Sequence, residues 1–287
     1  MHAQLDTYAT PDDYRHAVDG YLRAHLFACN QLFAGIQALT PTLMARRQSW
    51  LARLHRHGQT CGIALINSML PARVLSLSDL DDEEAHPVAD ALSNSAIRPT
   101  AIVGPQHAAE ILAACLTRQG GASTGAAIRL GNHILSTTPA IPSCAGNWRA
   151  ATLDDIDLLV QWRTAFMIDC GLPDGADDLQ REIRERIVSS AALFWLWEVD
   201  GGPVAMALGQ CLPPVGRIGM VYSMPSQRGH GYAGALVAHV SRQLLAQGCE
   251  GVFLFTDMGN PVSNGVYRRI GYRLLGEQLE VALHWPD

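Results

Sequence analysis

Membrane and secretion signals are missing from this sequence. No apolar run reaches the roughly 18 residues of a membrane-spanning helix. The N-terminus also lacks the basic stretch and apolar core of a signal peptide. None of the seven cysteines forms a C-x-x-C pair, and their odd number argues against a disulfide framework. We therefore expect a cytoplasmic protein with free thiols, no membrane partner and no metal site.

Clustered positive charge is also scarce. The net charge is −6 and the basic residues are scattered, whereas a nucleic-acid partner requires clustered Lys and Arg. We expect no nucleic-acid partner.

The sequence does contain 48% apolar residues in a chain of 287, enough for one large or two ordinary globular domains. A Pro-rich stretch at 137–147 indicates a boundary, so we predict domains at 1–140 and 141–287.

Alternating helical and extended patterns predict a protein of the α/β (α+β) class. In the first half, the sequence predicts strands at 59–66, 72–77 and 100–103, a turn at 67–71, and helices at 81–96 and 105–118. In the second half, it predicts strands at 193–199, 204–211, 217–223 and 251–256, with a hairpin turn at 200–203.

A glycine-rich loop at 224–234 connects the strand at 217–223 to a helix. Unpaired N–H groups and the dipole at a helix N-terminus attract anions, and glycines let an anion come close. Three interpretations stay open: a pyrophosphate-binding loop, a turn without a ligand, or the G-x-G-x-x-G fingerprint of an NAD(P)-dependent oxidoreductase with Asp257. Only 30 residues follow Asp257, too few for the further βα units of a dinucleotide fold, so the last is the weakest.

The segment after the strand at 251–256 predicts a short helix. Asn260 suits its N-cap, Pro261 its first turn and Gly271 its C-terminal end. Asn264 and Tyr267 are three residues apart, so both project from one side of this helix. From spacing alone, Tyr267 could simply pack with its hydroxyl at the surface.

Taken together, the two segments resemble the GNAT acetyltransferase superfamily. Residues 228–233, Arg-Gly-His-Gly-Tyr-Ala, are similar to its R-x-x-G-x-G/A loop. Residues 260–272 resemble its N-x-x-A-x-x-L-Y-x-x-x-G-F segment, with the departures Ser263, Val266 and Tyr272. The likeness covers roughly 148–285. The whole chain resembles bacterial tandem GNAT proteins, which implies two GNAT-like domains, each a mixed, mostly antiparallel sheet flanked by helices. The first would be a degenerate copy, with 103–105 (Val-Gly-Pro) in place of the loop.

The resemblance implies transfer of an acetyl group from acetyl-coenzyme A to a primary amine, by direct attack in a ternary complex. The residues implied to bind the pyrophosphate are Arg228, Gly229, His230, Gly231, Tyr232 and Ala233. Those implied to bind the pantetheine arm and the thioester are Val221, Tyr222, Ser223, Asn260 and Asn264. Tyr267 would also contact the coenzyme, and as the catalytic acid it would protonate the departing thiolate.

The sequence does not fix the acceptor, the oligomeric state or the general base. The acceptor is expected to be a small-molecule or peptide amine, and the chain a monomer or a homodimer. Glu198, Asp257 and Asp169 are candidates for the general base, although a structural or solvated role suits each of them better. The acidic segment 169–178 either attracts a cationic amine or is a solvated loop. A non-catalytic, coenzyme A-binding regulatory module is the main alternative function.

Overall fold

The computed structural model describes residues 3–41, 44–45, 49–66, 73–171, 179–189 and 192–286. The chain divides into two compact units. The first comprises Met1–Gly131 and Gly276–Asp287, and the second Asn132–Leu275. The boundary expected at 140 lies inside the second unit, where the Pro-rich stretch is a coil leading to a strand. The predicted turn at 67–71 falls outside the described residues.

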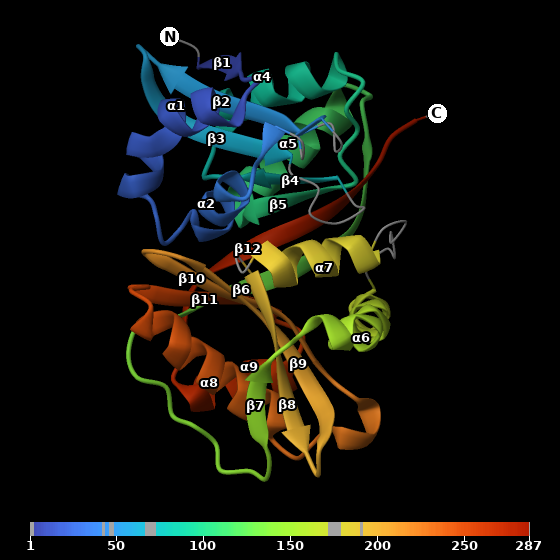
Figure 1. The fold of residues 1–287 in the computed structure, drawn as a ribbon. Coiled ribbons are helices and arrows are strands. Elements are labelled where there is room, and N and C mark those ends of the chain that lie inside the picture. The colour runs from blue at the N-terminus through green and yellow to red at the C-terminus, as the bar shows by residue number, and fades with distance from the viewer. Residues whose placement is uncertain are drawn as a thin grey trace. The chain divides into compact units, whose positions relative to one another are not determined.

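The first unit is a sheet with helices on both faces (Figure 1). Its elements are β1 (Gln4–Thr7), α1 (Pro11–Ala24), α2 (Asn30–Gln37), β2 (Trp50–Arg56), β3 (Gln59–Ile66), β4 (Val74–Leu77), α4 (Asp82–Ser93), β5 (Ala101–Pro105), α5 (Gln106–Arg118), most of β6 (Ser123–Leu135) and most of β12 (Arg273–His284). Strands pair in the order β1-β2-β3-β4-β5-β12. Only the β4–β5 pair is parallel among these neighbours.

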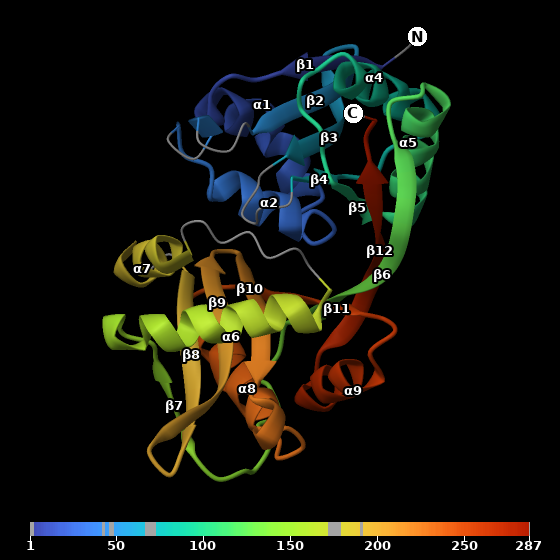
Figure 2. The same ribbon diagram turned by 90° about the vertical axis from the view of Figure 1, so that its right-hand side faces the viewer.

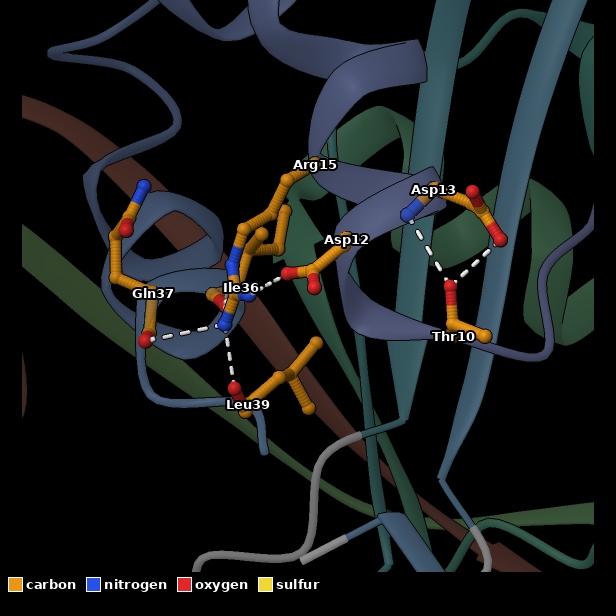
Figure 3. A network of polar contacts seen from close by, with 7 residues as sticks. All are labelled: Thr10, Asp12, Asp13, Arg15, Ile36, Gln37 and Leu39. Carbon is orange, nitrogen blue, oxygen red and sulfur yellow. Dashed lines mark hydrogen bonds and ion pairs between the residues drawn. The ribbon is translucent and has the colours of Figure 1, made fainter. Parts of the chain in front are cut away.

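Alternation along the strands sends side chains to two apolar clusters in this unit. Leu65 of β3 packs with α1 and α2, while Ala64 and Ile66 pack with α4 and α5. Figure 3 shows how α1 and α2 are tied together: the Arg15 guanidinium donates to the carbonyl oxygens of Ile36 (3.2 Å) and Leu39 at the end of α2. A cation there suits the negative end of the helix dipole.

The second unit is also a sheet between two helical layers (Figure 2). Its elements are the end of β6, β7 (Asn147–Ala150), a 3-10 turn (Leu153–Asp155), α6 (Ile156–Asp169), α7 (Leu179–Ser189), β8 (Ala192–Val199), β9 (Gly202–Leu212), β10 (Val215–Ser223), a 3-10 turn (Pro225–Gln227), α8 (Tyr232–Ala246), β11 (Gly251–Asp257), α9 (Pro261–Ile270) and the start of β12. Strands pair in the order β6-β11-β10-β9-β8-β7. Only β10–β11 is parallel among the registered pairs.

The predicted hairpin between β8 and β9 is confirmed. Val199 pairs with Gly202, which leaves a two-residue loop. Asp200 and Gly201 both have positive φ, 51° and 78°, the backbone that a two-residue turn with right-handed strand twist requires. The second-half strands lie within two residues of the predicted bounds.

Alternation also divides the core of the second unit. Phe194 and Leu196 of β8 pack on the face covered by α6 and α7, whereas Trp197 packs with α8 on the other face. Both faces are therefore buried, as expected for a three-layer domain.

Each unit includes a strand from the other half of the sequence. Gln278–Ala282 of β12 pair with Ala101–Pro105 of β5 in the first unit. In the second unit, the end of β6 neighbours β11, where the Ile134 side chain lies against Gly251. Local patterns could not predict these pairings, because the partners are more than a hundred residues apart. The fold is a mixed α/β arrangement with mostly antiparallel strands, as predicted.

Candidate functional site

In the second unit, two neighbouring strands pair for only part of their length. β10 and β11 are registered from Val215↔Gly251 to Arg217↔Phe253 and not beyond. Residues 218–223 of β10 therefore present backbone groups along an edge without a strand partner. Such an edge can pair with an extended ligand that carries amide groups, in the manner of an added strand.

A bulge interrupts the other edge of β10 at the same level. Gly219 pairs with Leu208 of β9 and Tyr222 pairs with Met206, so Met220 and Val221 lie opposite one residue. Met220 has φ of 49°, in the left-handed region. Because the bulge adds one residue, Ile218 faces α8 while Tyr222 faces α6, against Trp162 (ring centroids 5.9 Å apart). The bulge also turns backbone groups out of the β9 ladder.

After β10, the chain passes through the glycine loop into α8. Gly229 and Gly231 both have φ of 85°, and added Cβ atoms there would meet nothing within 4 Å. None of the N–H groups of residues 229–234 donates to another group in the part of the chain that is described, and the first internal bond runs from the Ala235 N–H to the Gly231 carbonyl. The loop is thus a row of free donors at a helix N-terminus, open on one side, and suits an anion.

The Arg228 side chain is held in place beside this loop. Its guanidinium donates to the Asp169 carboxylate at 2.5 Å and to the Ser223 carbonyl at 3.2 Å, and it lies over the Tyr222 ring. The ion pair connects the end of α6 to the loop. His230 stacks on Tyr232 at 5.4 Å, with its Nδ1 near two loop carbonyl oxygens.

The start of α9 forms the opposite side of the site. Asn260 is the N-cap, as predicted: its Oδ1 accepts from the Ser263 N–H at 3.1 Å. The Asn264 Nδ2 donates to the carbonyl oxygens of Asp257 (2.9 Å) and Asn260 (2.7 Å). Its Oδ1 is buried and has no partner among the described residues. A buried acceptor without a donor is costly, which points to a donor supplied by a ligand.

Tyr267 is buried, with 8% of its surface exposed. Burial raises its pKa to about 12, and the neighbouring Cys170 contributes in the same direction. The side chain is therefore a neutral phenol throughout the physiological range, with a proton to donate. Cys170 follows α6 and its own pKa is raised by burial and by Asp169 and Asp257, so the end of α6 lies at this site.

All three candidates for the general base already form hydrogen bonds or ion pairs. The Glu198 carboxylate accepts from Arg149 at 2.8 Å, and Asp169 is paired with Arg228. Asp257 accepts from the Gly259 N–H at 2.7 Å. Of the acidic segment 169–178, residues 172–178 lie outside the described ranges, and Asp169 already has a cationic partner.

Sequence reasoning missed the structural partners around these motifs. The Arg228–Asp169 pair, the proximity of Cys170 to Tyr267 and the bulge at Met220 all join segments that are distant in sequence or depend on strand register. Among the described residues, no helix is long and apolar enough to cross a bilayer. No cluster of three or more His, Cys, Asp or Glu in those ranges could hold a metal ion.

A parallel pair that separates, a bulged strand and a glycine loop before a helix together form a site that suits an extended ligand with amide groups and an anion. Residues 157–272 match the model of the "Acetyltransferase (GNAT) family". The matched part of the second unit is similar to this family, whose members transfer acetyl groups from acetyl-coenzyme A. A curated relative, an acetyltransferase of Yersinia pestis, is 28% identical over 120 residues, which cover 39% of this chain and 83% of the relative.

Two solved structures resemble nearly the whole chain, and a third resembles most of it. A Drosophila protein matches 98% of this chain and 98% of its own, with a TM-score of 0.68 and 12% identity. A GNAT-family acetyltransferase from Colwellia psychrerythraea matches 98% of this chain and 99% of its own, with a TM-score of 0.58 and 12% identity. A GCN5-related N-acetyltransferase from Kribbella flavida matches 79% and 87%, with a TM-score of 0.54 and 16% identity. At these sequence identities, the similarity is evidence for the fold alone.

Proposed function

We propose that this protein transfers an acetyl group from acetyl-coenzyme A to a primary amine, a small molecule or a peptide, in a ternary complex. The observation that carries the proposal is the row of free N–H groups at residues 229–234, which continues from the unpaired edge of β10. An anion site and an edge that binds amides, joined end to end, match a pyrophosphate followed by the two amides of a pantetheine arm.

Particular residues would hold this co-substrate. The N–H groups of Gly229 to Ala233 would bind the pyrophosphate, with Arg228 and His230 at its side. The backbone of Val221 and Ser223 would pair with the pantetheine amides. The partnerless Oδ1 of Asn264 would accept an amide N–H from the opposite side. Asn260 would contribute through its remaining amide group, because its Oδ1 already caps α9.

The chemical step needs no protein nucleophile. The neutral amine attacks the thioester carbon, and a backbone N–H at the bulge, near Val221 or Tyr222, stabilises the tetrahedral oxyanion. The C–S bond then breaks, and the departing thiolate takes the proton of the Tyr267 hydroxyl. The proton lost by the amine passes to solvent or to a base, and Tyr267 is reprotonated, so charge and atoms balance.

The first domain, predicted at 1–140, would be a degenerate copy of the second, at 141–287, with a structural role. Its support is the order of elements: β4, α4, β5 and α5, with β4–β5 parallel, repeat the order β10, α8, β11 and α9, with β10–β11 parallel. In that order, the segment equivalent to the glycine loop is 78–81, between β4 and α4, and not 103–105.

Calorimetric titration tests this proposal. We expect acetyl-coenzyme A to bind with micromolar affinity, NAD not to bind, and coenzyme A to be released when an amine is added. Binding without turnover on a broad panel of amines would favour the regulatory module, and preference for NAD would favour an oxidoreductase. No binding of either would mean that the loop is only a turn.

A further inference from the structure

An arginine without a counter-ion lies where β10 and β11 separate. Arg217 is in the last registered pair of the two strands, opposite Phe253. It is partly buried, and in the described part of the chain it makes no hydrogen bond or ion pair. Its guanidinium lies over the Phe255 ring, with the guanidinium carbon 5.4 Å from the ring centroid.

Strand alternation fixes the face on which Arg217 projects. A Cβ added to Gly216 would meet Leu244 of α8, and Ile218 packs in the α8 cluster. Arg217, between them, therefore projects from the opposite face, the one on which α6 and α7 pack. The bulge follows three residues later. The guanidinium thus lies next to the strand segment at which the thioester carbonyl is proposed to bind.

Magnitudes argue against a purely structural role. A cation–π contact is a weak interaction, and it offsets only part of the cost of withdrawing even part of a guanidinium from water without a counter-ion. Burial lowers the pKa of Arg217 to about 10, so the side chain is still a cation at neutral pH. The aromatic contact alone leaves this desolvation uncompensated, and an anion would compensate it.

A second arginine adds positive charge to the same side of the sheet. Arg163 lies on the buried stripe of α6, between Leu159 and Met167 one turn away on either side. It is 2% exposed, and its Nε and Nη1 have no hydrogen-bond partner among the described residues. Buried guanidinium groups are normally paired, so two such groups make this side of the sheet electropositive.

We propose that the acceptor amine carries a carboxylate, as an amino acid does, and that the Arg217 guanidinium binds it. This inference rests on the proposed acetyl transfer and narrows its substrate class. A carboxylate accepts two parallel hydrogen bonds from a guanidinium, which would orient the amine toward the thioester.

The test compares amino acids with their decarboxylated amines, for example phenylalanine with phenethylamine, as acceptors. For the wild-type chain, we expect kcat/KM to favour the carboxylate form by at least about 50-fold. Arg217→Gln should lower kcat/KM for the amino acid by about 100-fold and for the amine by less than about threefold. Arg217→Lys keeps the charge but loses the bidentate geometry. Its kcat/KM for the amino acid should therefore lie between the values of the wild type and Arg217→Gln.

Arg273→Gln is the matched control, because Arg273 is exposed in the same unit. This control variant should change kcat/KM neither for the amino acid nor for the amine. A wild-type preference for the decarboxylated amine, or an equal loss for both acceptors in Arg217→Gln, would overturn the inference while leaving acetyl transfer intact. If no amine is acetylated, the proposed function fails. Titration of the protein loaded with coenzyme A then decides the carboxylate site: N-acetylphenylalanine should bind, N-acetylphenethylamine should not, and equal binding would refute it.

Discussion

The N-termini of α4 and α8 occupy the same place in the element order of the two units, yet their chemistry is opposite. At α4, Asp81 is the N-cap and forms a capping box with Glu84, with bonds of 2.9 and 3.0 Å. The first turn contains Asp82, Glu83 and Glu84. At α8, the N-cap is Gly231, the first turn has no acid, and the N–H groups are free.

The following helices differ in the same way. In α9, Tyr267 lies seven residues after the N-cap Asn260. In α5, the residue seven after the N-cap Pro105 is Leu112, which is fully buried. The first unit therefore has an apolar side chain where the second has a phenol, and its helix N-terminus is filled by carboxylates that repel an anion.

The same order of elements can thus use its helix ends for stability or for ligand binding. Capping groups stabilise a helix by about 1 kcal/mol each, and an uncapped N-terminus gives up that stability. The second unit places its acidic capping box elsewhere, at Thr152 and Asp155 before α6. α8 is left open, which is consistent with a site reserved for an anion.

Tyr267→Phe tests the sharpest difference between the units. If Tyr267 is the acid, kcat should fall by about 1000-fold, while calorimetric affinity for acetyl-coenzyme A stays within about threefold, because the phenyl ring still fills the site. Since its pKa is raised to about 12, wild-type kcat should show no loss from Tyr267 deprotonation near pH 10. Unchanged kcat in the variant would remove Tyr267 from the mechanism.

Gly231→Asp would give α8 the N-cap residue of α4. Because Asp and Asn both tolerate the left-handed backbone better than most residues, Gly231→Asn is the isosteric control without charge. Aspartate should weaken coenzyme A binding by about 100-fold relative to asparagine, through repulsion of the pyrophosphate. Titration at constant ionic strength measures the ratio. Equal affinities of the two variants for coenzyme A would mean that the loop does not bind the pyrophosphate.

Two arginines beside the two helix ends should have different roles. Arg56 bridges Asp81 at 2.8 Å and Glu84 at 3.2 Å, while Arg228 lies beside the glycine loop. Arg228→Ala should reduce coenzyme A affinity by about tenfold. Arg56→Ala should leave that affinity unchanged and lower the unfolding free energy, because Asp81, Glu83 and Glu84 lose their cationic partner. A loss of coenzyme A affinity in Arg56→Ala, with unchanged affinity in Arg228→Ala, would contradict these two roles.

Asp155→Asn tests whether the capping box of the second unit is structural. The Arg149 guanidinium binds both carboxylate oxygens of Asp155, at 2.6 and 2.8 Å, and lowers the pKa of that carboxyl. The variant should lose about 1.5 kcal/mol of unfolding free energy at neutral pH, without loss of coenzyme A affinity. The stability from a depressed pKa is present above the ordinary value of about 4 and is lost as pH falls through the folded one.

Urea unfolding of both proteins from about pH 7 down to pH 3 measures this difference. The gap between wild type and Asp155→Asn should narrow as the pH falls below the ordinary carboxyl value of about 4, because Asp155 then begins to take up its proton. A gap that is constant with pH would mean that the ion pair contributes nothing beyond packing.

Local patterns predicted much of the second unit. The turn at Asp200 and Gly201, the N-cap at Asn260 and the end of α9 at Gly271 depend only on neighbouring residues, and all three are as expected. The helix from Pro105 to Arg118 begins one residue later than predicted, because Pro105 ends β5. The strand β6 and the passage of β12 into the first unit were not predicted, since their partners are far along the chain.

The sequence by itself determined the short-range chemistry: the glycine loop, the capped helix with Tyr267, and the family that these segments resemble. Backbone preferences and caps act over a few residues, so they can be read directly. Tertiary structure decided which strands separate, where the bulge lies, that Asp169 is bound by Arg228, and that Arg217 has no counter-ion among the residues that the structure describes. These depend on strand register and on packing between distant segments, and local patterns contain no information about either.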